Sequence, residues 1–200
     1  MNTNEFEYYF IERENNDQYP LLTADTGCPP YLRKKEYIEN PETMKFRLGK
    51  PVPRIPKMVD YHSAIYPVVS QKIYDVLAPM NIKGIQLIPA IITGKKMVIF
   101  NGIYENYWFI NICNHFPALD REKSVCEWDS MGVAYYMEKI VLNEEYLKTI
   151  PLEERLVFFL SENGVKQFFH KSVVDAIMAT NPKGLKFYNV REWEDGMQFD

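Results

Sequence analysis

The feature that most constrains the fold is a short pattern that occurs twice in the chain. Residues 81–90 read "NIKGIQLIPA" and residues 181–190 read "NPKGLKFYNV". Both open with Asn-x-Lys-Gly and continue into an apolar run, and their glycines are 184 − 84 = 100 residues apart. A repeat of this kind predicts the same supersecondary unit twice.

Each copy follows a short helical pattern. Ile73, Val76 and Leu77 form an apolar i, i+3, i+4 stripe, and Val173, Ala176 and Ile177 repeat it. Gly84 and Gly184 can take the positive φ of a tight turn after each helix. The following strands would then direct Ile85 and Leu87, or Leu185 and Phe187, towards the core. We therefore predict two similar helix–turn–strand units, at about residues 69–90 and 169–190.

The two units differ in their capping signals. Ser70 precedes the first helical pattern and is a favourable N-cap residue. His170 stands at the equivalent place in the second copy, which predicts weaker capping there, with Ser172 as an alternative start two residues later.

The rest of the chain is rich in strand signals. Aromatic and β-branched residues predict strands in four segments: 6–13, 96–103, 107–116 and 155–162. Residues 15–60 contain seven prolines, which favours loops and short edge strands over helices and central strands. The predicted fold class is α+β, with an antiparallel or mixed sheet. Residues 1–60 would form an N-terminal strand and a Pro-rich loop region packed on a core of residues 61–200, as one domain overall.

Composition excludes several classes of protein. A formal net charge of −4 over 200 residues does not favour a partner that is nucleic acid or membrane. The N-terminus "MNTNEFEYYF" has neither a basic region nor a long apolar region, so it does not resemble a signal peptide. Three cysteines without CxxC spacing argue against a disulfide framework. We expect a cytoplasmic protein.

Charge is unevenly distributed along the chain. The first thirty residues are acidic, whereas Arg33 to Lys57 is a predominantly basic segment. Two interpretations are open: the basic segment offsets the acidic one within the molecule, or it meets an acidic partner.

The sequence shows no recognised catalytic motif. Cys113 and His115 form an isolated C-x-H without further ligands at metal-site spacing, so we expect no metal and no cofactor. The adjacent pairs Glu144–Glu145 and Glu153–Glu154 resemble solvated helix faces. A small enzyme that uses Cys113 or these acidic pairs remains an alternative.

Residues 118–128, "ALDREKSVCEW", are the most unusual polar stretch. One interpretation is structural, with Asp120 accepting backbone amides in a turn. The other is a recognition loop in which Trp128 serves as an anchor.

Four segments together carry a family resemblance: "KMVDYHSAIYPVVSQKIYDVLAPMNIKGIQLIPA", "YWFINICNHFPALDREKS", "KIVLNEEYLKTIPLEERLVFFLSE" and "HKSVVDAIMATNPKGLKF". In this order they resemble a bacterial immunity-protein family, immunity type eleven, first catalogued as a domain of unknown function. The resemblance covers roughly residues 50–195. It implies a protein that binds a cognate toxin, delivered by type VI or other contact-dependent secretion, and neutralises it in the producing cell. It implies no catalytic residue.

The resemblance leaves the binding surface open. A few aromatic or charged side chains usually dominate such an interface. The candidate interface residues are Tyr104, Tyr107, Trp108, Asp120, Glu122, Trp128 and Trp193. Besides the enzyme, the other alternative is a scaffold that binds a protein of the same cell.

Overall fold

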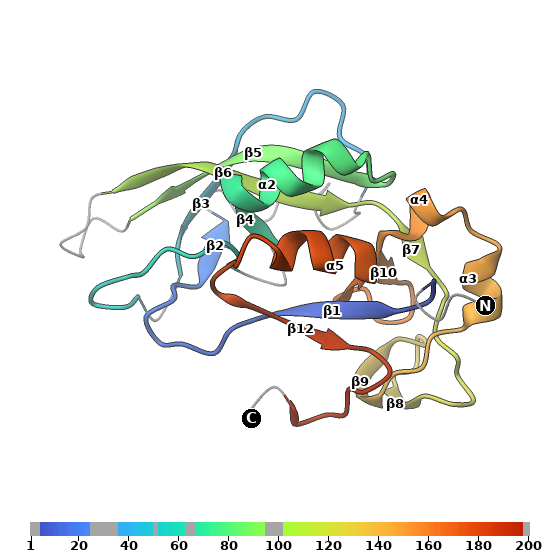
Figure 1. Ribbon diagram of the computed structural model, residues 1–200. Helices are drawn as coiled ribbons and strands as arrows, with labels where there is room; N and C mark the ends of the chain where they lie inside the picture. Colours follow the sequence, from blue (N-terminus) through green and yellow to red (C-terminus); the bar gives the residue numbers. More distant parts are fainter. Residues whose placement is uncertain (1–4, 25–35, 50–51, 63–66, 95–101, 198–200) are drawn as a thin grey trace.

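The computed structural model describes residues 5–24, 36–49, 52–62, 67–94 and 102–197 (Figure 1). Its strands are β1 (Tyr8–Arg13), β2 (Leu22–Ala24), β3 (Met44–Leu48), β4 (Val68–Ser70), β5 (Ile85–Thr93), β6 (Ile103–Ile112), β7 (His115–Phe116), β8 (Val125–Trp128), β9 (Ala134–Lys139), β10 (Val157–Leu160), β11 (Gln167–His170) and β12 (Leu185–Asn189). Its helices are α2 (Gln71–Leu77), α3 (Glu144–Lys148), α4 (Leu152–Arg155) and α5 (Lys171–Met178), with a 3-10 turn η1 (Ala78–Met80). The predicted α+β class is confirmed.

Two five-stranded mixed sheets form the frame. Sheet A has the order β12-β1-β11-β10-β7, in which only the β10–β7 pair is parallel. Sheet B has the order β2-β3-β5-β6-β4, in which only the β3–β5 pair is parallel. Strands β8 and β9 form a separate antiparallel hairpin.

The Pro-rich region contributes more to sheet B than the sequence predicts. Strand β3 lies between β2 and β5 and is therefore internal, so the expectation of edge strands alone is wrong. Pro41 and Pro51 flank β3 but none lies within it, so every amide of Met44–Leu48 can join the ladder. Most of the strand predicted at 96–103 lies outside the described residues.

The sequence repeat corresponds to a structural repeat. In sheet B, β4 and β5 flank β6, and α2 connects them; in sheet A, β11 and β12 flank β1, and α5 connects them. Each unit is thus a split βαβ, with an antiparallel third strand inserted. The two helices contact each other between the sheets (Figure 1).

The turns of the two units share the same backbone conformation. Asn81 and Asn181 have φ of 48° and 52°, and Gly84 and Gly184 have φ of 81° and 86°. A Cβ on Gly84 would lie 2.0 Å from the Asn114 side chain, and one on Gly184 would lie 2.5 Å from Val59 Cβ. Both glycines are therefore required by conformation and by close packing.

The capping prediction is reversed. Ser70 occupies the N-cap of α2 but makes no side-chain cap bond, because its hydroxyl donates to Asp60 Oδ1 at 2.6 Å. His170 Nδ1 accepts from the Ser172 amide at 3.2 Å, so α5 begins at Lys171 rather than two residues later.

Three apolar clusters form the core of the described part of the chain. The central cluster lies between the two sheets and contains both helices, with Ile73 and Ile177 among its members. The second covers the opposite face of sheet A, beneath the β8–β9 hairpin and α3. The third covers the opposite face of sheet B, under residues such as Ile38 and Val52 of the Pro-rich region. Alternation along β10 shows the division: Val157 and Phe159 face the central cluster, whereas Phe158 and Leu160 face the second.

The chain passes from sheet B to sheet A at Cys113 and Asn114, so the strand predicted over 107–116 is broken there. Asn114 Nδ2 donates to the carbonyls of Lys83 (3.0 Å) and Glu154 (2.5 Å). Its own carbonyl accepts from the Phe159 amide at 2.9 Å. Asn114 therefore joins the first repeat to the edge of sheet A.

Candidate functional site

The structure separates the candidate interface residues into three places. Tyr104, Tyr107 and Trp108 lie on β6 in sheet B. Asp120, Glu122 and Trp128 lie in and before β8, and Trp193 follows β12.

The aromatic residues of β6 mainly serve packing. Tyr107 is buried in the third cluster, and its hydroxyl donates to the Val59 carbonyl at 3.2 Å. Burial raises the pKa of Tyr107 to about 12. Trp108 stacks on Tyr74 with ring centroids 3.7 Å apart, and its indole N–H donates to Gln71 Oε1 at 2.9 Å. Trp108 thus fastens α2 to sheet B, and Tyr104 packs against the third cluster.

Trp193 is a core residue. It is 3% exposed and packs edge-to-face on Phe10 with centroids 5.1 Å apart. Lys166 Nζ lies 4.6 Å from the Trp193 ring. A side chain this deep cannot touch a partner, so we remove Trp193 and Tyr107 from the candidate surface.

The polar stretch before β8 forms a turn around Asp120. Its Oδ1 accepts from the amides of Glu122 and Lys123, both at 3.2 Å, and Lys123 Nζ lies 2.8 Å from its Oδ2. The hydrogen bond from Lys123 lowers the pKa of Asp120. This geometry agrees with the structural interpretation of Asp120, while the Glu122 side chain is exposed.

The β8–β9 hairpin presents exposed aromatic residues that the sequence analysis did not single out. Cys126, Trp128, Ala134 and Met137 pack towards the second cluster. On the other side, Tyr135 is 62% and Tyr136 40% exposed.

Two irregularities in the ladder explain this exposure. Glu127 pairs with Tyr136 and Trp128 with Ala134, so Tyr135 is an extra residue in β9. Glu138 is extra in the same way, between the partners of Val125 and Cys126. Bulges redirect side chains, and no local sequence signal marks them reliably. Tyr135 and Tyr136 lie outside every strand that the sequence analysis predicted.

The C-terminal segment extends the exposed side of the hairpin. Tyr136 donates to Asp195 Oδ2 at 2.8 Å, and the Asp195 amide donates to the Glu138 carbonyl at 3.0 Å. The backbones of Lys139 and Glu194 form an isolated antiparallel β-bridge. We call this surface the hairpin face; its members are Val125, Glu127, Tyr135, Tyr136, Glu138, Glu194 and Asp195.

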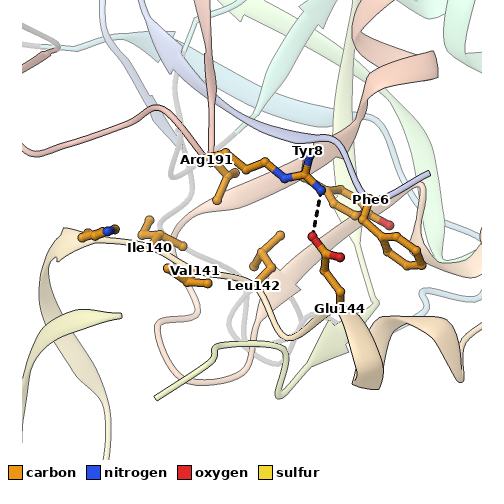
Figure 2. A pocket seen from close by; sticks show the side chains of 9 residues that line it. Phe6, Tyr8, Ile140, Val141, Leu142, Glu144 and Arg191 are labelled. Carbon is orange, nitrogen blue, oxygen red and sulfur yellow. Dashed lines mark hydrogen bonds and ion pairs between the residues drawn. The ribbon is translucent and has the colours of Figure 1, made fainter. Parts of the chain in front are cut away.

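A cavity of about 270 Å³ lies next to Lys139 and the C-terminal segment (Figure 2). Its apolar lining comes from Phe6, Tyr8, Ile140, Val141, Leu142 and Val190. Arg191 reaches across it to Glu144, with 2.7 Å between Nη2 and Oε1. Glu144 is the one acid in the lining of this cavity, and Arg191 pairs with it.

Comparison with known proteins identifies the family. The Imm11 immunity protein family model matches residues 5–192, nearly the whole chain. The chain belongs to this immunity protein family. No curated protein matches the sequence.

The residues named for the enzymatic alternative have other contacts in the described part of the chain. Burial raises the pKa of Cys113, which opposes thiolate formation. Cys113 also lies at the passage between the sheets, and the His115 ring stacks on Phe159. The acidic pairs contribute to surface ion pairs: Glu144 with Arg191, and Glu153 with Lys83. Within the described ranges, no three His, Cys, Asp or Glu side chains gather as metal ligands.

Two other sequence expectations can be compared with the immunity protein's structure. Glu5 and Glu12 pair with Arg155 and Lys166, at 3.1 and 3.3 Å. Arg33, Lys34, Lys35 and Lys50 of the basic segment lie outside the described residues. Lys45 and Arg47 of that segment lie on the exposed side of β3.

None of the helices in the described ranges is both long and apolar enough to span a membrane.

Proposed function

We propose that this immunity protein binds a cognate bacterial toxin in the cytoplasm of the producing cell and neutralises it stoichiometrically. The observation that carries the proposal is the family match over residues 5–192. Delivery of the toxin by type VI or another contact-dependent secretion system is part of the proposal, because the resemblance implies it.

We assign the hairpin face as the centre of the interface. Its tyrosines combine apolar rings with polar tips, a composition enriched at protein interfaces. They stand on paired strands above a packed cluster, so a partner would meet a preorganised surface with little loss of side-chain freedom. A standard interface buries about 1,600 Å² in total, so it would extend beyond the hairpin.

Co-expression tests the function directly. The toxin encoded beside this gene is expressed alone and together with the immunity protein, and growth and co-purification are measured. We expect restored growth and a stable complex. Equal killing in both cultures, with no complex by size-exclusion chromatography, would contradict the proposal.

A Cys113→Ser variant separates binding from catalysis in the same assay. We expect it to protect cells as well as the wild type, because the thiol is half-buried within the fold and has a raised pKa. Loss of protection with unchanged thermal stability would favour the enzymatic alternative.

A further inference from the structure

The hairpin face carries an excess of negative charge. Residues 125–138 contain three carboxylates, Glu127, Asp129 and Glu138, and no lysine or arginine. Residues 192–195 contain three more, Glu192, Glu194 and Asp195, again without a cation. The hydrogen bonds of Tyr136 and Asp195 bring the two segments together. Lys139 directly follows the first segment, and Arg191, which pairs with Glu144, directly precedes the second.

Lys166 attracts Asp195, whereas three other carboxylates of the hairpin face have no paired cation in the described part of the chain. Among the described residues, Glu127, Glu138 and Glu194 form no ion pair, whereas acids elsewhere, such as Asp60 and Glu12, do. Tyr135 donates its hydroxyl to Glu127, and Tyr136 donates to Asp195. The carboxylate bonds raise the pKa of both tyrosines, which therefore remain hydrogen-bond donors near neutral pH. A tyrosine bond orients a carboxylate and leaves its charge in place.

A residue with a buried carboxylate, Glu162, is hydrogen-bonded to strand β9. Glu162 is 6% exposed, and its carbonyl accepts from the Ala134 amide at 2.7 Å. Its Oε2 is buried without a hydrogen-bond partner in the described part of the chain. A buried charge without a partner is costly, and positive charge nearby would reduce that cost.

On its other side, the hairpin already holds a cation against an aromatic ring. The Arg121 guanidinium lies 4.2 Å from the centroid of the Trp128 ring. Tyr135 and Tyr136 offer further rings close to carboxylates, the combination that suits arginine through cation–π contact and charge-assisted hydrogen bonds.

We propose that the hairpin face recognises a basic, arginine-bearing surface of the toxin. This inference rests on the proposed function. Tyr135 and Tyr136 supply the apolar contact, and Glu127, Glu138 and Glu194 supply the attraction. Complementary charge of this kind speeds association and disfavours partners that are not basic.

The test compares two triple variants with the same change in net charge. The first combines Glu127→Gln, Glu138→Gln and Glu194→Gln, and the new amide oxygen beside Tyr135 can still accept its hydroxyl. The matched control changes Glu36, Glu39 and Glu42 to Gln, all exposed in the Pro-rich region. Binding to the purified toxin encoded beside this gene is measured by surface plasmon resonance at low and physiological salt.

We expect the first variant to associate about 10-fold more slowly at low salt, with a flatter salt dependence, and the control to change less than about 2-fold. A tight complex with equal association rates for both variants would overturn the inference that the hairpin face recognises a basic surface, and it would leave the proposed function intact. Absence of any complex with the wild type would instead overturn the proposed function.

An octa-arginine peptide provides a readout that does not need the toxin. In ¹⁵N NMR spectra we expect its addition to shift amides of residues 125–138 and 192–195 selectively. Shifts spread over all acidic surfaces, or absent from the face, would overturn the inference. The alternative is that the protein binds itself in solution through this face. Self-association that disappears when Lys45 and Arg47 are changed to Gln would overturn the inference, because the hairpin face would then bind a second copy of the chain.

Discussion

Individual backbone positions decide how each helix–turn–strand unit ends. At Gly184, a positive φ of 86° coincides with close approach to Val59. Gly132, in the β8–β9 turn, has a similar φ of 78° but nothing within 4 Å of where a Cβ would lie. The two glycines therefore separate conformational cost from steric cost.

We expect Gly184→Ala to lower the free energy of unfolding by about 2–5 kcal/mol, because left-handed strain and overpacking add. Gly132→Ala should cost only about 1–2 kcal/mol, from the strain alone. Urea denaturation of both variants measures the difference. Equal costs would mean that Val59 moves aside freely.

The aromatic residues include buried core side chains and exposed surface side chains, which substitution can tell apart. Trp193→Ala should cost about 3–5 kcal/mol in the free energy of unfolding, because it empties a packed site. Tyr135→Ala should change stability by less than about 0.5 kcal/mol, yet weaken toxin binding about 10-fold or more. Thermal denaturation and titration calorimetry distinguish the two effects. Unchanged affinity of Tyr135→Ala would remove this residue from the interface.

His62 makes stability depend on pH. It is 1% exposed, and its Nδ1 lies 3.2 Å from the Pro20 carbonyl, so the proton sits on Nδ1. Burial lowers the pKa of His62 from 6.5 to about 4, although the bond to Pro20 opposes this. Between these values the unfolded chain binds a proton that the folded protein does not.

The contribution of His62 is therefore complete above about pH 6.5 and declines as the pH falls to about 4. We expect the free energy of unfolding of the wild type, relative to His62→Gln, to fall by about 3 kcal/mol over this range. Urea titrations of both proteins at pH 7 and pH 4 measure it. Parallel pH profiles would show that the buried ring becomes charged without cost.

Between elements, Asp60 joins the start of the first unit to the turn of the second. Ser70 Oγ donates to its Oδ1, and Lys72 Nζ and the Lys183 amide donate to its Oδ2, at 2.8 and 2.9 Å. Burial acts to raise the pKa of Asp60, but these donors outweigh it and the pKa is lowered. Asp75, on the exposed side of α2, accepts only from Gln71 four residues earlier in the described structure.

We expect Asp60→Asn to cost about 1–3 kcal/mol of unfolding free energy, because one amide hydrogen-bond donor would face existing donors. Asp75→Asn is the matched control, with an expected change below about 0.5 kcal/mol. Chemical denaturation compares them. A similar small effect at both sites would mean that the two units are held together by apolar packing alone.

At the scale of the whole molecule, the first sixty residues are built into both sheets. Strand β1 lies between β11 and β12, and β3 lies between β2 and β5. We expect a fragment of residues 61–200 to lack cooperative unfolding, because sheet A would lose an internal strand. Adding residues 1–60 as a separate chain should restore the far-UV circular dichroism. A cooperative transition of the fragment alone would establish residues 61–200 as an independent domain.

The sequence predicted the helices and strands better than it predicted which strands pair with one another. The repeat, its glycines and its inward stripes are local patterns, and the structure confirms them. The internal position of β3 and the passage between sheets at Asn114 depend on pairing between distant segments. Nothing in residues 44–48 or 107–116 alone specifies those partners.

The amino-acid sequence alone was enough to predict the fold class, the two helix–turn–strand units and the family, because these depend on short-range periodicity and on the order of segments. Which aromatic side chains are exposed became clear only from the folded chain. Trp193 is buried because it packs on Phe10 of β1, whereas Tyr135 is exposed because bulges in the β8–β9 ladder redirect it. Burial depends on contacts across the whole molecule, and therefore no local pattern in the sequence could mark the exposed tyrosines of the hairpin face.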